Sequence, residues 1–147
     1  MKFLKSVLSI AILFLTLQTG ALAQNGNLSD IFKTHMNETV KEVKNSDNAD
    51  DKREILDSSF NKMLKAVEKI ENRATMSENE LAQLKTFRDA IQEKSNQLNG
   101  LEGYKKVADV DLEDFSEYSQ QDMEQADKTL TISITTVLLV IIILLLL

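Results

Sequence analysis

The chain contains no proline, and its four glycines stand at positions 20, 26, 100 and 103. Residues 27–99 therefore lack both of the residue types that most often interrupt a helix. Within this stretch apolar residues recur at steps of three and four, which is the spacing of one helix face. The sequence predicts an all-α fold, a small helical bundle.

Three apolar stripes define three helices. The first stripe consists of Leu28, Ile31, Phe32, Met36, Val40 and Val43. The second consists of Leu56, Phe60, Met63, Val67, Ile70 and Ala74, widened by Ile55 and Leu64. The third consists of Leu81, Leu84, Phe87, Ile91, Lys94 and Leu98. The second and third repeat with the 3.5-residue period of packed helices, so each is expected to bury one face.

The residues between the stripes predict where the helices begin and end. Ser29 is a candidate N-cap of the first helix, and the polar residues 45–51 separate it from the second. Ser77 and Glu80 form a capping box at the start of the third helix, and Gly100 is typical of its end. The turn before Ser77 is short, so the second and third helices form an antiparallel hairpin, with the first helix expected in the groove between them.

Residues 109–128 allow two interpretations. Positions 109–127 hold eight acids and no base, which is typical of a solvated stalk. The same segment has helical spacing, with Asp111 as a candidate cap. Its stripe consists of Leu112, Phe115, Ser119, Met123 and Ala126. A fourth helix is favoured over a stalk.

Residues 129–147 contain no charge, glycine or proline. A helix of this length spans about 28 Å, close to the ~30 Å hydrocarbon core of a bilayer. We expect a C-terminal transmembrane helix in contact with membrane lipid, although no basic residue follows it. The alternative is a tail that is removed and replaced by a glycolipid anchor near residues 116–119, where the large Tyr118 fits poorly.

Residues 1–23 have the organisation of a secretory signal peptide. Lys2 and Lys5 precede an apolar run, and a small-x-small cleavage pattern ends at Ala23. The alternative is an uncleaved N-terminal anchor. Together with the tail, a signal peptide predicts a single-pass membrane protein whose helical domain, residues 24–108, lies on the extracytoplasmic side, facing the periplasm or the cell surface.

The part between the two ends is acidic and poor in large apolar residues. Leu, Ile, Val and Phe account for 21 of the 105 residues in 24–128, so the core is expected to be thin. No cysteine is present to add a disulfide. Cleavage after Ala23 would leave 23 acids against 15 bases, a net charge near −8. Nucleic acid and anionic lipid headgroups are poor partners for such a surface.

The residues that could carry chemistry form no recognisable site. His35 is the only histidine, and without cysteine it has no partners for a zinc site or a catalytic pair, so we expect it at the surface or at the boundary of the core. Asp47, Asp50 and Asp51 lack the central glycine of a calcium loop and are followed by two bases. We expect no enzyme activity, no cofactor and no metal site.

These features favour a protein-interaction or structural module of the cell envelope, which binds a protein partner or associates with itself. A cation- or small-ligand-binding sensor is the alternative, because of the acidic segment 109–127.

Overall fold

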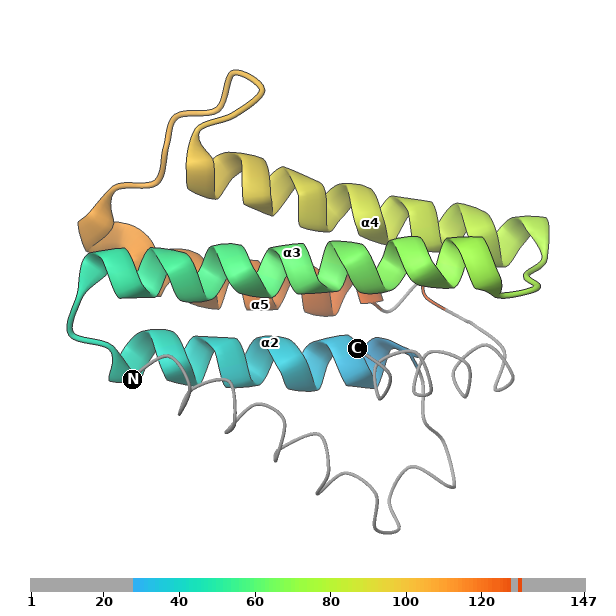
Figure 1. Cartoon of the computed structure of the whole chain (residues 1–147), viewed down its shortest axis with the longest axis horizontal. Helices are drawn as coiled ribbons and strands as arrows, with labels where there is room; N and C mark the ends of the chain where they lie inside the picture. The colour runs from blue at the N-terminus through green and yellow to red at the C-terminus, as the bar shows by residue number, and fades with distance from the viewer. Residues whose placement is uncertain (1–27, 128–129, 131–147) are drawn as a thin grey trace, which may run out of the picture.

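The computed structural model describes residues 28–127 and Leu130, which form a bundle of four α-helices (Figure 1). The helices are α2 (Leu28–Asn45), α3 (Ala49–Arg73), α4 (Glu78–Asn99) and α5 (Leu112–Asp127), with a single 3-10 turn, η1 (Asp109–Asp111), before α5. Each helix runs antiparallel to the next one in the chain, and α5 lies beside α2 as well as α4. The predicted all-α bundle is confirmed, with two helices in addition to the α3–α4 hairpin.

The core consists of the predicted stripes. Its buried apolar residues are Leu28, Phe32, Met36, Val40, Val43, Leu56, Phe60, Met63, Ala66, Val67, Ile70, Leu84, Phe87, Ile91, Leu98, Leu112, Phe115, Met123 and Leu130. Ile31, Ile55, Leu64 and Ala74 pack at its edge. Lys94, which occupies a stripe position, is also buried, and its ammonium lies 2.5 Å from the Asp122 carboxylate and 4.1 Å from the centre of the Tyr118 ring. A cation in the seam is thus paired rather than left without a partner.

The helix ends agree with the predicted signals at two places and differ at two. Ser77 and Glu80 form the reciprocal capping box, and Gly100 closes α4 in the left-handed conformation, with φ of 69°. However, α2 already begins at Leu28, so Ser29 lies within the helix and not at its N-cap. The predicted break at 45–51 is shorter, because the Asn48 side chain accepts a hydrogen bond from the amide of Asp50 and starts α3 at residue 49.

The position of α2 differs from the prediction. Helix α2 lies beside α3 and α5, and not in a groove between α3 and α4. It reaches α4 across the core, where the Phe32 and Phe87 rings lie 5.0 Å apart. The reason is that α5 supplies a fourth apolar stripe, and four antiparallel helices bury all four stripes only when each has two neighbours.

The acidic segment forms helix α5, the favoured one of the two interpretations. Leu112, Phe115 and Met123 enter the core. Its carboxylates meet bases from the other three helices, in the pairs Lys33–Glu124 (3.5 Å), Lys44–Glu117 (2.6 Å), Lys52–Glu113 and Lys94–Asp122, and Arg53 pairs with Asp109 of η1 (2.7 Å). The bases that 109–127 lacks are therefore supplied in the folded chain. The candidate cap Asp111 lies in η1.

The two ends of the chain are outside this description. The predicted signal peptide, 1–23, and the predicted transmembrane helix, 129–147, fall on residues that the structure does not describe, apart from Leu130. Leu130 is buried and belongs to the core cluster. Among the described residues, no helix combines the length and apolar character needed to cross a bilayer.

The buried seam generates a stability prediction. Val67→Asp places an unpaired carboxylate at a fully buried position, which costs about 4 kcal/mol and approaches the roughly 5 kcal/mol total of a small domain. The purified variant should lose its cooperative thermal transition in circular dichroism. Val110→Asp is the matched control, because Val110 is 89% exposed and should tolerate the same change. Equal melting of the two variants would show that the seam is not the core.

Candidate functional site

Most of the large apolar side chains that are exposed in the described residues lie in the connection between α4 and α5. Within the described part of the chain the exposed large hydrophobics are Leu101, Tyr104, Val110 and Tyr118, and three of them lie in residues 100–111, which we call the tip loop. Figure 1 shows the tip loop rising beyond α4 on the side away from α2. Aromatic and aliphatic side chains exposed together mark candidate contact surfaces.

The backbone of the tip loop is left-handed at three residues. Gly100, Glu102 and Gly103 all adopt positive φ, of 69°, 53° and 84°. The amide of Leu101 donates to the carbonyl of Asn96, and the amide of Tyr104 donates to the carbonyl of Leu101, which closes a tight turn. A left-handed Glu costs about 1 kcal/mol relative to glycine, so this conformation is held by its surroundings.

Arg53 of α3 holds the tip loop in place. Its guanidinium donates to the carbonyls of Leu98 and Val107 and to the carboxylate of Asp109, each at 2.7 Å. The hydrogen bond from Arg53 lowers the pKa of Asp109 below its ordinary value. One side chain therefore joins the end of α4, the middle of the loop and the start of η1, and five donors in a planar fork suit this role.

The end of the bundle that carries the tip loop is rich in acids. Its exposed carboxylates belong to Asp47, Asp50, Asp51, Glu54, Glu102, Asp109, Asp111 and Asp114. Lys105 and Lys106 are the exposed bases of the loop itself. The arrangement is an apolar, held loop with an acidic surround. It can enter an apolar pocket on another molecule and favours a pocket with a basic rim.

His35 lies in a polar cluster between α2 and α3 that the sequence analysis did not find. Its Nε2 atom is 3.0 Å from the Ser59 hydroxyl, which is 2.8 Å from the Thr39 hydroxyl. Thr39 donates to the carbonyl of His35 at 3.0 Å. Burial, and then the charge of Lys62, lower the pKa of His35 to about 4, so the ring is neutral at neutral pH. His35 is partly buried, at the boundary of the core.

The direction of donation decides what this cluster can do. The Thr39 hydroxyl donates its single proton to the His35 carbonyl. The Ser59 hydroxyl must therefore donate to the Thr39 oxygen and accept a hydrogen bond from Nε2–H of His35. A histidine that activates a serine has to accept the serine proton, which is the opposite direction. Ser59 is also only 4% exposed. The cluster satisfies polar groups at a helix interface and is not arranged as a nucleophile with its base.

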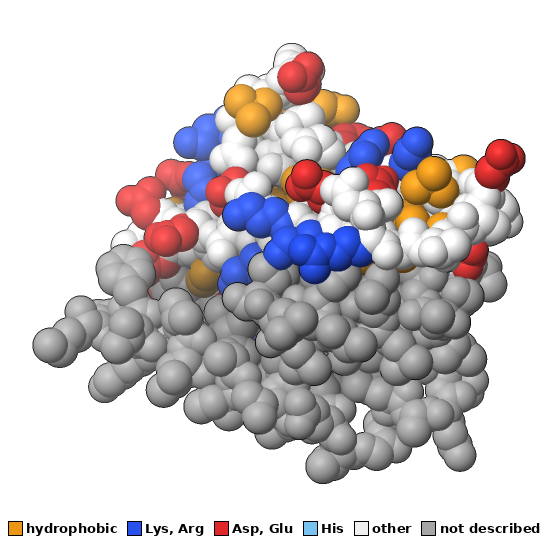
Figure 2. Space-filling model, turned by 45° about the vertical axis from the view of Figure 1, so that its right-hand side comes forward, with side chains coloured by type: hydrophobic (Ala, Val, Ile, Leu, Met, Phe, Trp, Pro, Cys, Tyr) orange, Lys and Arg blue, Asp and Glu red, His pale blue; other side chains and the backbone are white. Residues whose placement is uncertain are grey.

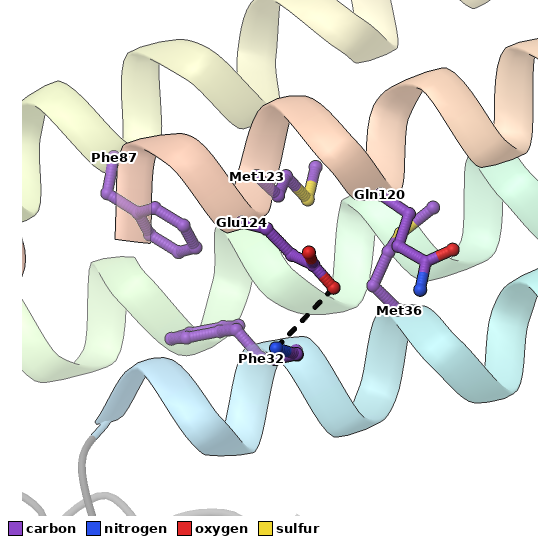
Figure 3. A pocket seen from close by; sticks show the side chains of 7 residues that line it. Phe32, Met36, Phe87, Gln120, Met123 and Glu124 are labelled. Atoms are coloured by element: carbon purple, nitrogen blue, oxygen red, sulfur yellow. Dashed lines mark ion pairs between the residues drawn. The ribbon is translucent and has the colours of Figure 1, made fainter. Parts of the chain in front are cut away.

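The described bundle contains one small pocket of note, between α2, α4 and α5 (Figure 3). Phe32, Met36, Phe87 and Met123 form its apolar wall, and the Lys33–Glu124 ion pair lies at its side. The space that a water molecule's centre can occupy is about 10 Å³, roughly the room for one water. Ligand sites are typically some hundreds of Å³, so this pocket is a packing gap.

The acids considered for calcium lie at the junction of α2 and α3. Asp50 and Asp51 occupy the first turn of α3, where they suit the positive end of a helix, and Asp47 is exposed in the preceding turn. In residues 28–127, no group of three or more potential metal ligands converges. A comparison of the chain with protein-family models, curated proteins and solved structures found no match.

The His35 cluster generates a pH prediction. As the pH is lowered, His35 takes up a proton near pH 6.5 in the unfolded chain, but only near pH 4 in the folded chain, where its pKa is lowered to about 4. Stability is thus complete above pH 6.5 and falls between pH 6.5 and 4, by up to about 3 kcal/mol. In urea melts at a series of pH values, His35→Gln, whose amide can donate to Ser59, should remove most of this fall in the unfolding free energy. The other titrating groups, including Glu38 with its raised pKa, are common to both proteins. Parallel profiles would contradict the assignment.

The two loop glycines provide a matched pair of variants. A Cβ on Gly100 would lie 2.8 Å from Cβ and 2.9 Å from the backbone nitrogen of Lys106, whereas a Cβ on Gly103 meets nothing within 4 Å. Both positions have positive φ, so alanine strains both by about 1 kcal/mol. Gly100→Ala should therefore lower the unfolding free energy further than Gly103→Ala, by more than 1 kcal/mol. Equal losses in denaturant melts would mean that the loop does not press against α4.

Proposed function

We propose that this protein is a membrane-anchored helical interaction module whose bundle lies outside the cytoplasm and binds a protein partner through the tip loop. The observation that carries the proposal is the exposure of Leu101, Tyr104 and Val110 in a loop held by backbone hydrogen bonds at its turn and by Arg53 in its second half. A loop that is already fixed loses little conformational entropy when it binds, so more of the contact energy remains as affinity.

The side chains of the tip loop suit a binding role. Tyr104 offers a large ring and a hydroxyl, and exposed Tyr residues are typical anchors of protein interfaces. Val110 is 89% exposed, and contact with a partner would cover apolar area that now faces water. The acidic surround supports a partner whose pocket is apolar and whose rim is basic.

The chain order supports a membrane anchor at the opposite end. The tip loop precedes α5, and residues 129–147 follow it. Sixteen helical residues separate the two by about 24 Å, and Figure 1 shows the tip loop and the end of α5 at opposite ends of the bundle. An anchor at 129–147 would leave the tip loop on the side away from the bilayer.

The two alternatives have less support. A cation sensor needs free carboxylates, but five acids of the segment 109–127 are engaged by bases. A glycolipid anchor near residues 116–119 requires cleavage there, where Ser116 and Ser119 are buried within α5. Such a cut would divide a core helix.

Site-specific photocrosslinking in native membranes tests the partner. A benzoylphenylalanine at Tyr104 should give a discrete adduct, and the same probe at exposed Gln92 of α4 should give none. Leu101→Ser with Val110→Ser should remove the adduct without unfolding the bundle, because both side chains are exposed. An adduct of twice the chain mass would identify self-association. Monomer alone, or equal adducts from both positions, would count against the proposal.

Alkaline extraction tests the anchor and the topology. The species that runs from Gln24 to the end of the chain should stay in the membrane pellet, because a nineteen-residue apolar helix binds far more tightly than one lipid chain. Protease added on the extracytoplasmic side should digest the bundle. Release by carbonate, or protection of 24–128 from that protease, would overturn the topology.

A further inference from the structure

The second half of α3 carries a stripe of bases. Lys62, Lys65, Lys69 and Arg73 follow one another at steps of three, four and four, within an arc of about 80° on the helix. Three of them are exposed and Lys69 is half-buried. Figure 2, in which the right-hand end of Figure 1 comes forward, shows Lys and Arg side chains lying side by side on the described surface.

The basic stripe is not explained by pairing within the bundle. The ion pairs of the described residues use Lys33, Lys44, Lys52, Arg53, Arg88 and Lys94, and none of the four stripe residues. The two acids in this half of α3 do not pair with the stripe either: Glu71 is taken by Arg88 of α4, and exposed Glu68 takes part in none of these ion pairs. In addition, Lys65 and Lys69, and Lys69 and Arg73, are like charges four residues apart, which is unfavourable in an isolated helix. No ion pair of the described residues neutralises the stripe, so its charges remain available to a ligand outside the bundle.

The charge of α3 is divided along its length. On the same side of the helix, the first half presents the acids Asp51 and Glu54. The second half presents the basic stripe, with one exposed acid, Glu68, beside it. The basic half lies at the end of the bundle where α5 finishes and Leu130 follows. Although the chain as a whole is acidic, fields at a surface are screened within about 8 Å, so the local charge decides what this end attracts.

The stripe also faces a defined side of the bundle. Ser59, one turn before Lys62, bonds to Thr39 and His35 of α2, whereas Glu71 bonds to α4. The stripe therefore lies on the α2 side of α3, and the tip loop rises on the far side of α4 (Figure 1). A surface that binds the stripe leaves the tip loop free.

We propose that Lys62, Lys65, Lys69 and Arg73 bind the anionic headgroups of the membrane that holds the chain, and so fix the tilt of the bundle with the tip loop turned away. This rests on the proposed anchoring through 129–147. Lipid is favoured over an acidic protein because the stripe lies at the end where the chain would enter the bilayer, and basic residues beside a membrane anchor are attracted to anionic lipid.

The absence of cysteine allows a direct test on the full chain. Asn72→Cys places one label beside the stripe, and Gln92→Cys places it on an exposed position of α4 as the control. Each labelled chain is reconstituted into phosphatidylcholine vesicles, with or without phosphatidylglycerol, that contain a nitroxide-headgroup lipid. Quenching at position 72 should be several-fold stronger with phosphatidylglycerol and should fall in high salt. Position 92 should show little quenching in either lipid.

Charge reversal separates lipid binding from mere proximity. Lys62→Glu with Lys65→Glu should remove the quenching at position 72, whereas Lys85→Glu on α4 should not, and melting curves of both must remain cooperative. Quenching that is equal in the two lipids, or that survives the reversal, overturns the proposal. Carbonate extraction of the same vesicles distinguishes the premises: retention without salt-sensitive quenching refutes the stripe alone, and release refutes the anchor and the stripe together.

Discussion

The bundle depends on the docking of α5, a helix whose acids find their bases elsewhere in the chain. Alone, the segment 109–127 has too few apolar residues and too much like charge to fold. Against α2, α3 and α4 it buries Leu112, Phe115 and Met123 while lysines from all three helices pair with its carboxylates. Exposed pairs are individually weak, at about 0.2–1 kcal/mol. Their larger effect is on register, because sliding α5 along the bundle would separate each of these carboxylates from its lysine.

The helices were predictable because their signals are local. Absence of proline, apolar spacing, the Ser77 capping box and the Gly100 terminator all act within one or two turns, and all are in the structure. The neighbours of α2 were not predictable in the same way. An apolar stripe indicates that one face of a helix is buried, but it does not identify the helix that covers this face. The neighbours of α2 became clear only from the structure, in which α5 is a core helix.

The candidate site was less accessible to sequence reasoning, because it is made by contacts between distant residues. Arg53 reaches carbonyls 45 and 54 positions away, and backbone carbonyls carry no sequence signal. The one local signal was the pair Gly100 and Gly103, because two glycines close together often mark positions with positive φ. The partners of His35 had a weaker signal: Ser59 and Thr39 stand among apolar neighbours on facing helices, where a hydroxyl needs a partner.

The order of tip loop, α5 and Leu130 along the chain has a mechanical consequence. A partner that pulls on Tyr104 while the chain is held beyond Leu130 applies tension lengthwise through α5. The two points flank α5, so the load would have to extend this helix, and its buried side chains and ion pairs hold it to α2 and α4 along its length. Resistance to force follows the rate of unfolding and not the equilibrium stability. A thin-cored bundle can therefore sustain a load in this direction that its modest stability would not suggest.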